Sequence, residues 1–429
     1  MMTTLSMLTS KKRIKYYKIL GVILGFCCLI SLTGCKSKTD DEPNQTKTDD
    51  TQTVENKYRN IKVKTTNPTP LYVYVDGKLV EGGTVEEGIY LDIADSDAIQ
   101  DKILINGTSW LVKQSDVQPA DRWFKNQTHL VPYGLEITTK DSYTLTNDDG
   151  KNQLNRLGSD VYTVYVKPSE DDSRYGVLIQ NGIYYISKDD VQSEKEIAIE
   201  TQELATTLPV MMYHFFYSEA NGETRGDVNF VEVNEFDEQC KYLVDNGYTS
   251  LTMREVQYFM EERGQIPVKS YALTIDDGDP SVHKYAYPIL KEYGINATLF
   301  LIGGWLDPIL PYDFVEMRED GLELQSHSFL MHQGGCSGMG HGGRLLCVSH
   351  DEGVQDTIQS YEYVDAGFVY CYPFGDVNDN AIQIMKDAGT KLAFTTEFGK
   401  INPSMDQLKL PRIRVTGGAG MAQYINHLN

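Results

Sequence analysis

From residue 208 to the C-terminus, apolar runs typical of strands alternate with segments typical of helices, and this alternation limits the fold more than any other feature. The predicted strands cover residues 208–214, 271–275, 297–302, 322–325, 368–372 and 392–395. The predicted helices cover residues 233–246, 253–263, 285–293, 314–320, 354–365 and 381–388. Strands joined by helical crossovers run parallel, so we expect an α/β domain whose sheet is open or closed into a barrel.

Polar side chains stand at the ends of several predicted strands. They are His214, Asp276, Asp277, His327 and the turn 373–375. In both forms of a parallel sheet, reactive side chains gather where the carboxyl ends of the strands meet. We therefore expect one site built from these residues.

Asp276 and Asp277 repel each other, so their adjacency needs a reason. A divalent metal supplies one, because one carboxylate can bind the ion while the other stays free as a base. An ordinary Asp-Gly turn is the alternative for this stretch taken alone. His327 and His332 are five residues apart, which a helix would turn about 140° from each other, so they suit a strand end that runs into a loop. One aspartate with two histidines leaves positions open for water and substrate, as in catalytic metal sites.

Three motifs in residues 208–429 resemble those of the NodB-homology polysaccharide deacetylases, carbohydrate esterase family 4. They are Thr274–Gly278, Ser326–His332 and Tyr372–Gly375. The resemblance implies a distorted β/α barrel in which Asp277, His327 and His332 bind the metal. It also implies that Asp276 is the catalytic base. One aspartate and two histidines suit zinc, cobalt, nickel or iron, of which zinc is the first expectation.

Two departures from the commonest motifs are informative. The histidines of the second motif are five apart rather than four, and Cys371 stands where an arginine often precedes the proline of the third. Both features resemble the branch that deacetylates poly-β-1,6-N-acetylglucosamine. In that branch the general-acid histidine precedes the Asp-Asp strand, which implies His214. His427 is a poor alternative, because we expect fraying at the chain end.

The same resemblance extends to the remaining site residues. Residues 410–415 are similar to a late strand of that branch, in which Arg412 would orient Asp276, with Arg414 the second candidate. In the third motif, the backbone N–H of Phe374 would stabilise the oxyanion, with Tyr372 as a further substrate contact. The implied reaction releases acetate and leaves a glucosamine unit.

A glycine-rich segment, residues 333–350, interrupts the helix and strand pattern. It is expected to form a wall or lid of the cleft, with His341 and His350 as candidate substrate contacts; a disordered surface loop is the alternative. Cys336 and Cys347 lie within this segment, on either side of most of its glycines, and would form a disulfide in an oxidising compartment, or else remain free thiols. Trp305, Phe215 and Phe216 are candidates for stacking on sugar rings or for core packing.

The region before residue 208 has a different pattern. Short alternating runs separated by turns repeat at an offset of about 73 residues. They predict two small β-barrels, residues 61–120 and 121–193, which resemble bacterial SH3-like modules found in cell-wall proteins; a structural spacer is the alternative. Residues 36–60 are expected to be a flexible linker, and residues 194–207 a linker or a short helix.

Residues 1–35 predict an export signal. A basic stretch, 11–18, precedes an apolar stretch, 19–32, that is short for a membrane span. Leu32–Cys35 resembles a bacterial lipobox, so Cys35 would carry the lipid that holds the protein at the extracellular face of the cell membrane. An uncleaved anchor is the alternative.

The formal charge of −22 limits the partners. The first 34 residues have five basic and no acidic side chains, so the rest of the chain has a charge of −27. Such a surface disfavours nucleic acid and tolerates a neutral or cationic polymer. The sequence thus predicts metal-dependent de-N-acetylation of a β-linked N-acetylglucosamine polysaccharide, with poly-N-acetylglucosamine ahead of peptidoglycan. A non-catalytic wall-binding lipoprotein and a metal-dependent esterase or amidase on another acylated substrate are the alternatives.

Overall fold

The computed structural model describes residues 53–75, 77–85, 90–105, 110–119, 128–146, 153–157, 159–179, 182–199, 202–306, 308–365 and 367–429. The predicted export signal, with Cys35, lies outside these residues. The described residues form two compact units. The first holds those up to 121 together with 139–160 and 184–186, and the second holds those in 122–138, 161–183 and 187–429.

The first stretch of the chain is antiparallel β-structure. Its strands are β1 (Thr53–Val54), β2 (Lys62–Thr65), β3 (Thr69–Val75), β4 (Lys78–Val85), β5 (Tyr90–Asp92), β6 (Ala98–Ile99), β7 (Lys102–Leu104), β8 (Leu111–Lys113) and β9 (Val117–Pro119). They form two sheets with the orders β1-β6-β7-β8-β3-β4 and β5-β2-β9. The flexible linker predicted for residues 36–60 is wrong for its last residues, since β1 pairs with β6. Buried Asn56 also donates its side-chain amide to the carbonyls of Ala94 and Ser96.

A second set of antiparallel strands follows. They are β10 (Leu135–Thr139), β11 (Ser142–Thr146), β12 (Gln153–Leu157), β13 (Val161–Val166), β14 (Arg174–Ile179), β15 (Gly182–Ser187) and β16 (Val191–Glu196). Strands β8 and β9 are joined by one 3-10 turn (Gln114–Asp116), and β15 and β16 by another (Lys188–Asp190). The predicted linker begins too early, because residues 194–196 belong to β16.

The last part of the chain is a closed parallel barrel. Its strands, in spatial order, are β17 (Val210–Tyr213), β26 (Leu410–Arg414), β25 (Leu392–Phe398), β24 (Val369–Cys371), β23 (Glu323–Ser326), β22 (Thr298–Leu301) and β21 (Ser270–Ile275), with the short β20 (Thr249–Ser250) beside β21. Parallel pairing of β17 with β21 closes the ring. Of the two predicted forms of the sheet, the structure has the barrel.

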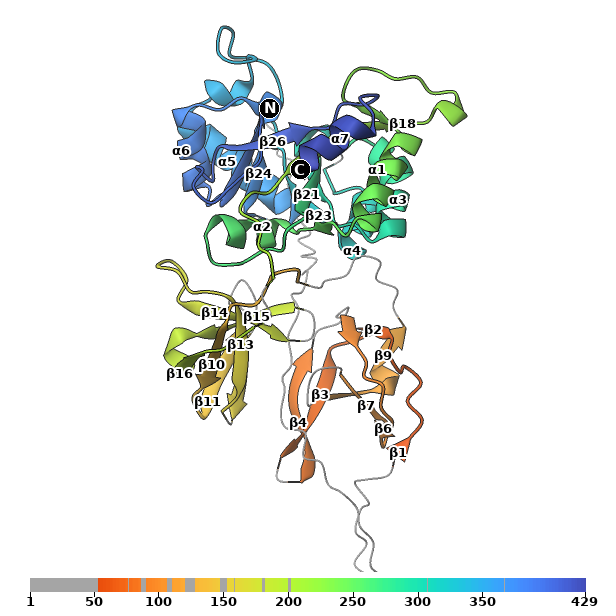
Figure 1. The fold of residues 1–429 in the computed structure, drawn as a ribbon, viewed down its shortest axis with the longest axis vertical. Helices are drawn as coiled ribbons and strands as arrows, with labels where there is room; N and C mark the ends of the chain where they lie inside the picture. Colours follow the sequence, from red (N-terminus) through yellow and green to blue (C-terminus); the bar gives the residue numbers. More distant parts are fainter. Residues whose placement is uncertain are drawn as a thin grey trace, which may run out of the picture. The chain divides into compact units, whose positions relative to one another are not determined.

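Helices cover the outside of this barrel. They are α1 (Val233–Asp245), α2 (Met253–Met260), α3 (Tyr287–Tyr293), α4 (Tyr312–Glu319), α5 (His350–Val364), α6 (Asp379–Asp387) and α7 (Met421–Leu428). Figure 1 shows α1 and α3 on one side of the strands and α5 and α6 on the other. A π-helical turn (Val282–Ala286) leads into α3, and a short parallel pair, β18 (Phe215–Tyr217) and β19 (Phe230–Glu232), was not predicted.

The start of helix α5 and the C-terminus of the chain differ from what the sequence predicts. Helix α5 begins at His350, because the hydroxyl of Ser349 accepts a hydrogen bond from the backbone N–H of Glu352 and caps the helix. The C-terminus does not fray. It forms α7, whose Tyr424 and Leu428 are buried in the main hydrophobic core.

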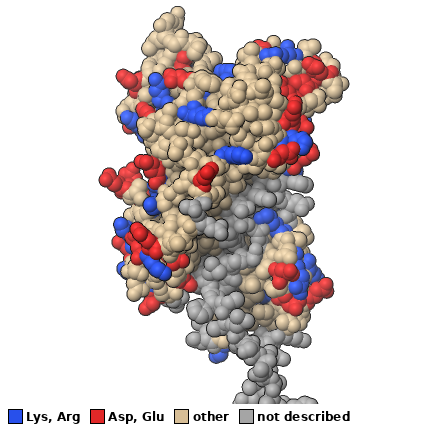
Figure 2. All heavy atoms as spheres, in the orientation of Figure 1, with Lys and Arg blue, Asp and Glu red and all other residues tan. Residues whose placement is uncertain are grey.

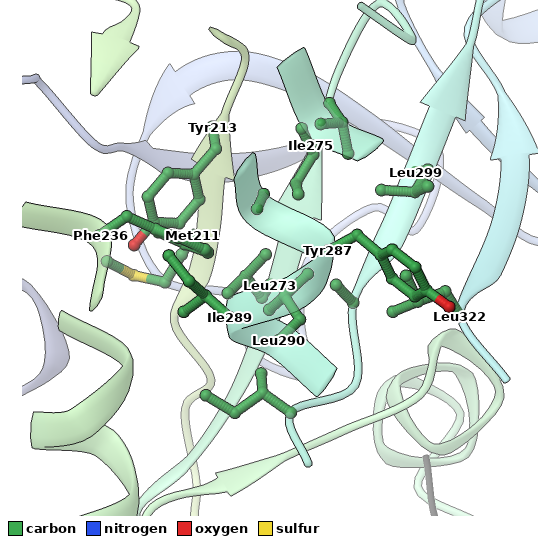
Figure 3. Packing of buried hydrophobic residues seen from close by; sticks show 14 of the residues in the cluster. Met211, Tyr213, Phe236, Leu273, Ile275, Tyr287, Ile289, Leu290, Leu299 and Leu322 are labelled. Atoms are coloured by element: carbon green, nitrogen blue, oxygen red, sulfur yellow. The ribbon is translucent and has the colours of Figure 1, made fainter. Parts of the chain in front are cut away.

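Alternation along β21 assigns its side chains to the two faces of the barrel wall. Tyr271, Leu273 and Ile275 belong to the core between barrel and helices, together with Leu290 of α3 (Figure 3). Successive strand residues point to opposite faces, so Thr274 and Asp276 point into the barrel. The chain therefore delivers the first carboxylate of the pair to the inside.

On the face seen in Figure 2, Lys and Arg side chains are dispersed among acidic ones and form no continuous basic patch. None of the helices in the described part of the chain has the length and apolar character needed to cross a membrane.

Replacement of Leu290 by alanine should destabilise the barrel. Leu290 is fully buried in the main core, so the change should lower the free energy of unfolding by about 2–5 kcal/mol. Val244→Ala, at an exposed position of α1, is the control and should change it by less than about 0.5 kcal/mol. Urea unfolding followed by circular dichroism measures both, and equal unfolding midpoints would contradict this packing.

Candidate active site

The predicted site residues meet at one end of the barrel. His214 follows β17, Asp276 and Asp277 follow β21, and His327 follows β23. The pairing of Tyr213 with Ile275 brings the ends of β17 and β21 level. Together with residues from the loops, they line a cleft of about 340 Å³. Its lining residues are His214, Phe215, Asn229, Asp276, Asp277, His327, His332, His341, Tyr372, Phe374, Gly375, Thr396 and Arg414.

Asp276 is held by Arg412 inside the barrel. The two Nη atoms of Arg412 donate to the two carboxylate oxygens over 2.8 and 2.7 Å, and both side chains are almost completely buried. Burial alone would raise the pKa of Asp276, but the guanidinium outweighs it and holds the pKa well below the usual range. Arg414 instead bonds to Asn229 and lines the cleft. Of the two predicted arginines, Arg412 is the one that orients Asp276.

Asp277, His327 and His332 form a compact group of potential ligands. The Nε2 atoms of His327 and His332 lie 3.4 and 3.6 Å from the same oxygen of Asp277, and the three donor atoms lie within 4.8 Å of one another. Nδ1 of His327 donates to the carbonyl of Cys371 over 2.8 Å, which leaves Nε2 as the free ligand atom. Asp277 and Ser328 have positive φ angles of 75°, a strained conformation typical of functional sites.

The electrostatics of this group suit a cation. Burial, together with the neighbouring His327, lowers the pKa of His332 to about 4. For His327 burial acts in the same direction, but Cys371 and the two aspartates outweigh it and raise the pKa. The imidazole of His332 is therefore neutral at neutral pH, the form that binds a metal, and the donor set of one carboxylate and two imidazoles fits a divalent metal.

A second group of potential ligands overlaps the first. Asp276, His327 and Cys371 also place donor atoms within 4.8 Å of one another. Asp276 and Cys371 are both engaged by Arg412, whose Nη2 lies 2.9 Å from the sulfur of Cys371. A guanidinium beside two of the three donors repels a cation, so the group of Asp277, His327 and His332 is the better candidate.

His214 also lies beside the carboxylate of Asp276. Its Nε2 is 3.8 Å from Oδ2 of Asp276, and its side chain is 13% exposed. Burial lowers the pKa of His214, although both aspartates act against this shift. His427 contacts the ring of Phe398 from α7 and does not line the cleft. The structure thus brings His214, and not His427, to the site.

The third motif forms a tight turn, Pro373–Gly375, at the cleft. Phe374 has a positive φ of 60°, and its ring lies 4.4 Å from that of His332. Tyr372 is buried, and its hydroxyl donates to the carbonyl of Leu408 over 2.9 Å. The phenol is therefore engaged in the core, while Tyr372 still lines the cleft, and its contact with substrate stays a prediction.

Aromatic candidates fall into two groups. Trp305 is 62% exposed, and its ring lies edge-on to His332 with centroids 4.9 Å apart. Phe215 lines the cleft, whereas Phe216 is buried and packs on Phe236. Trp305 and Phe215 are thus placed to meet a ligand, and Phe216 is a core residue.

The glycine-rich segment is an ordered wall of the cleft. Cys336 and Cys347 are joined by a disulfide. Asp376, a buried residue that the sequence reasoning missed, accepts hydrogen bonds from the loop and holds His341 at the cleft. His350 instead pairs with Asp351 and Asp387 at the start of α5, outside the lining residues. The one signal for Asp376 was its position directly after the third motif.

Comparisons with known proteins agree with this geometry. A family model described as polysaccharide deacetylase matches residues 263–393. The poly-β-1,6-N-acetyl-D-glucosamine N-deacetylase of Staphylococcus aureus strain MRSA252 is 30% identical over 203 residues, which are 44% of this chain and 69% of that protein.

Solved structures also match this part of the chain. The deacetylase PplD of Streptococcus pyogenes, in complex with acetate, is 25% identical with a TM-score of 0.45, over 52% of this chain and 98% of that one. IcaB from Ammonifex degensii is 23% identical with a TM-score of 0.42, over 50% and 94%. With 30% identity across more than two thirds of the staphylococcal enzyme, the chain belongs to the polysaccharide deacetylases, a family of hydrolases.

Proposed function

We propose that this protein removes N-acetyl groups from a β-linked N-acetylglucosamine polysaccharide, with poly-β-1,6-N-acetylglucosamine favoured over peptidoglycan. The observation that carries the proposal is the cleft in which an ionised, buried Asp276 adjoins both the ligand group Asp277, His327 and His332 and the imidazole of His214. The activity for which the staphylococcal relative is named supports the choice of polymer.

Asp277, His327 and His332 would hold a divalent cation. When bound, it would supply Lewis acidity to the N-acetyl carbonyl and to the attacking water. Zinc is the first candidate, and cobalt, nickel and iron also accept one carboxylate with two imidazoles. Because Arg412 lowers the pKa of Asp276, this carboxylate is ionised at neutral pH and free to accept a proton.

Two side chains of the protein would transfer the protons, and a backbone N–H would stabilise the negative charge. Asp276, oriented by Arg412, accepts a proton from the water as its oxygen attacks the carbonyl carbon. The backbone N–H of Phe374 stabilises the negative charge on the carbonyl oxygen. His214 donates a proton to the amide nitrogen as the C–N bond breaks. The products are acetate and a glucosamine unit with a free amine.

We also propose the export and anchoring predicted from residues 1–35, with Cys35 lipidated and the protein at the extracellular face of a bacterial membrane. The disulfide between Cys336 and Cys347 supports an oxidising compartment. The two β-regions would act as wall-binding or spacer modules of SH3-like type. A purely wall-binding role fits less well, because a decayed site would be expected to have lost a ligand.

With the metal assigned to Asp277, His327 and His332, substitutions in the two overlapping groups of ligands should affect metal binding differently. His332→Ala should abolish stoichiometric binding of zinc to the purified protein, because it removes one of three ligands. Cys371→Ser, in the overlapping group, should retain it. Elemental analysis after dialysis measures both, and loss of metal in the Cys371 variant alone would place the ion elsewhere.

Arg412→Met should destabilise the protein in a pH-dependent manner. Removal of one partner from a buried ion pair costs about 3–5 kcal/mol. In the wild type, the lowered pKa of Asp276 contributes stability that is present above the unfolded-state value of 3.8 and is lost as the pH falls through the folded value. In the variant, burial without the guanidinium raises the pKa of Asp276. The loss of stability relative to the wild type should therefore be greater at pH 7 than at pH 3.

The control for this change is Arg414→Met in the same strand. Arg414 bonds to Asn229 rather than to Asp276, so its loss should be smaller and nearly independent of pH. Urea unfolding of both variants at pH 3 and pH 7, in the presence of a chelator, measures the difference. An Arg412 variant with the same deficit at both pH values would refute the assigned role.

Acetate release tests the proposed reaction directly. We expect the metal-loaded protein to release acetate from poly-β-1,6-N-acetylglucosamine, more slowly from peptidoglycan, and not from O-acetyl xylan. Asp276→Asn should lower kcat by at least about 10²-fold while metal stays bound, and His214→Ala should have a comparable effect. Release from xylan alone would favour the esterase alternative, and no release with metal bound would favour another acyl substrate.

A further inference from the structure

His341 is the cleft residue whose position the proposed reaction does not explain. It lines the same cleft as the ligand group, yet its side chain is 71% exposed, whereas those of His327, His332 and Asp277 are 4, 10 and 12% exposed. The ligand group therefore lies at the bottom of the cleft and His341 at its rim. A polymer whose acetyl group reaches the bottom must pass the rim with a neighbouring sugar unit.

We propose that His341 is a substrate-binding residue that accepts a hydrogen bond from a hydroxyl of the sugar unit next to the one being deacetylated. The inference rests on the proposed function, and it extends the site from one sugar unit to at least two. The ligand it implies is a neutral, hydroxyl-rich saccharide chain.

Asp376 fixes the direction of the imidazole. Its carboxylate is almost completely buried and accepts a hydrogen bond from Nδ1 of His341 over 2.9 Å. The Nδ1 atom therefore carries the hydrogen, and Nε2 is left as an acceptor. Within the described part of the chain, no hydrogen bond to Nε2 is present. An oriented acceptor at the rim suits a hydroxyl donor.

The same carboxylate fixes the backbone of the loop. It accepts hydrogen bonds from the N–H groups of His341 and Gly343, each over 2.9 Å. The approach is close enough that a Cβ at Gly340 would lie 2.4 Å from the carboxylate, so glycine is required there. Asp376 directly follows the turn that holds Phe374. The loop with His341 is thus attached to the wall of the active site itself.

A disulfide and a backbone hydrogen bond further restrict the loop that holds His341. The disulfide joins Cys336 to Cys347, and within the segment it closes Cys336 donates its N–H to the carbonyl of Gly342 over 3.0 Å. A residue held in its binding orientation before the ligand arrives loses little conformational entropy on binding. This is the arrangement expected of a binding residue, and a passive surface loop has no need of it.

The experiment compares His341→Ala with His350→Ala in the full-length, metal-loaded protein. His350 is the matched control, because it is also an exposed histidine paired with carboxylates but does not line the cleft. The substrates are the tetramer of β-1,6-linked N-acetylglucosamine and the small ester 4-methylumbelliferyl acetate, which has no second sugar unit. Steady-state release of acetate and of the fluorophore gives KM and kcat for each.

We expect His341→Ala to raise KM for the tetramer by about fivefold to tenfold, the effect of one lost hydrogen bond, with kcat changed by less than about twofold. Hydrolysis of the ester should be unchanged, and His350→Ala should behave as the wild type on both substrates. His341→Gln keeps an acceptor at the same place and should recover part of the lost affinity.

Three results would overturn the inference. Equal KM values for the His341 and His350 variants would do so while leaving the proposed function intact. An equal loss on tetramer and ester would show that His341 acts on the chemistry or on the fold rather than on a second sugar unit. A wild-type protein that hydrolyses the ester but not the tetramer would contradict the proposed function, and the inference with it.

Discussion

The ion pair between Arg412 and Asp276 inside the barrel is the interaction on which the rest of the site depends. A guanidinium has five N–H donors, and here each has an acceptor: the two oxygens of Asp276, the hydroxyl of Thr274, the carbonyl of Thr395 and the sulfur of Cys371. These acceptors lie in or directly after three strands, β21, β24 and β25, and Arg412 itself lies in a fourth, β26. The contact that orients the carboxylate is therefore also a contact that holds the barrel wall together.

From this pair outward, the geometry follows from chain direction. Asp276 points into the barrel because side chains alternate along β21, and Asp277, the next residue, turns away through a positive φ toward His327 and His332. One peptide unit thus separates a carboxylate neutralised by a guanidinium from a carboxylate that attracts a cation. The strain at Asp277 is what allows two like charges to sit next to each other in sequence with different partners.

Much of this arrangement could be predicted from the sequence, because it depends on the pattern of apolar and polar residues along short segments. Strand and helix alternation gave the parallel sheet, and the position of residues at strand ends gave the site. Closure of the barrel depends on the pairing of β17 with β21, two strands about 60 residues apart, which no local pattern encodes. The same holds for helix α7, whose helical end is stabilised by tertiary burial of Tyr424 and Leu428.

The sequence could not show which polar groups around the site are already paired, because the hydrogen-bond partner of a side chain is known only once the fold is known. Tyr372 stands in a motif that borders the cleft, yet its hydroxyl is taken by Leu408. Asp376 looks like an ordinary residue after a turn, and only the structure reveals that it binds the loop of His341. Residue type and spacing therefore identified which groups can do chemistry, but not which of them are already occupied.

The packed interior of the barrel bears on how water reaches the site and how acetate leaves it. Phe300 and Phe394 lie with their rings 6.1 Å apart, and Arg412 lies over Phe300 within the same ring of strands. These fully buried side chains fill the interior of the barrel next to the ion pair. For the proposed reaction, water would then enter and acetate would leave through the same cleft that receives the polymer.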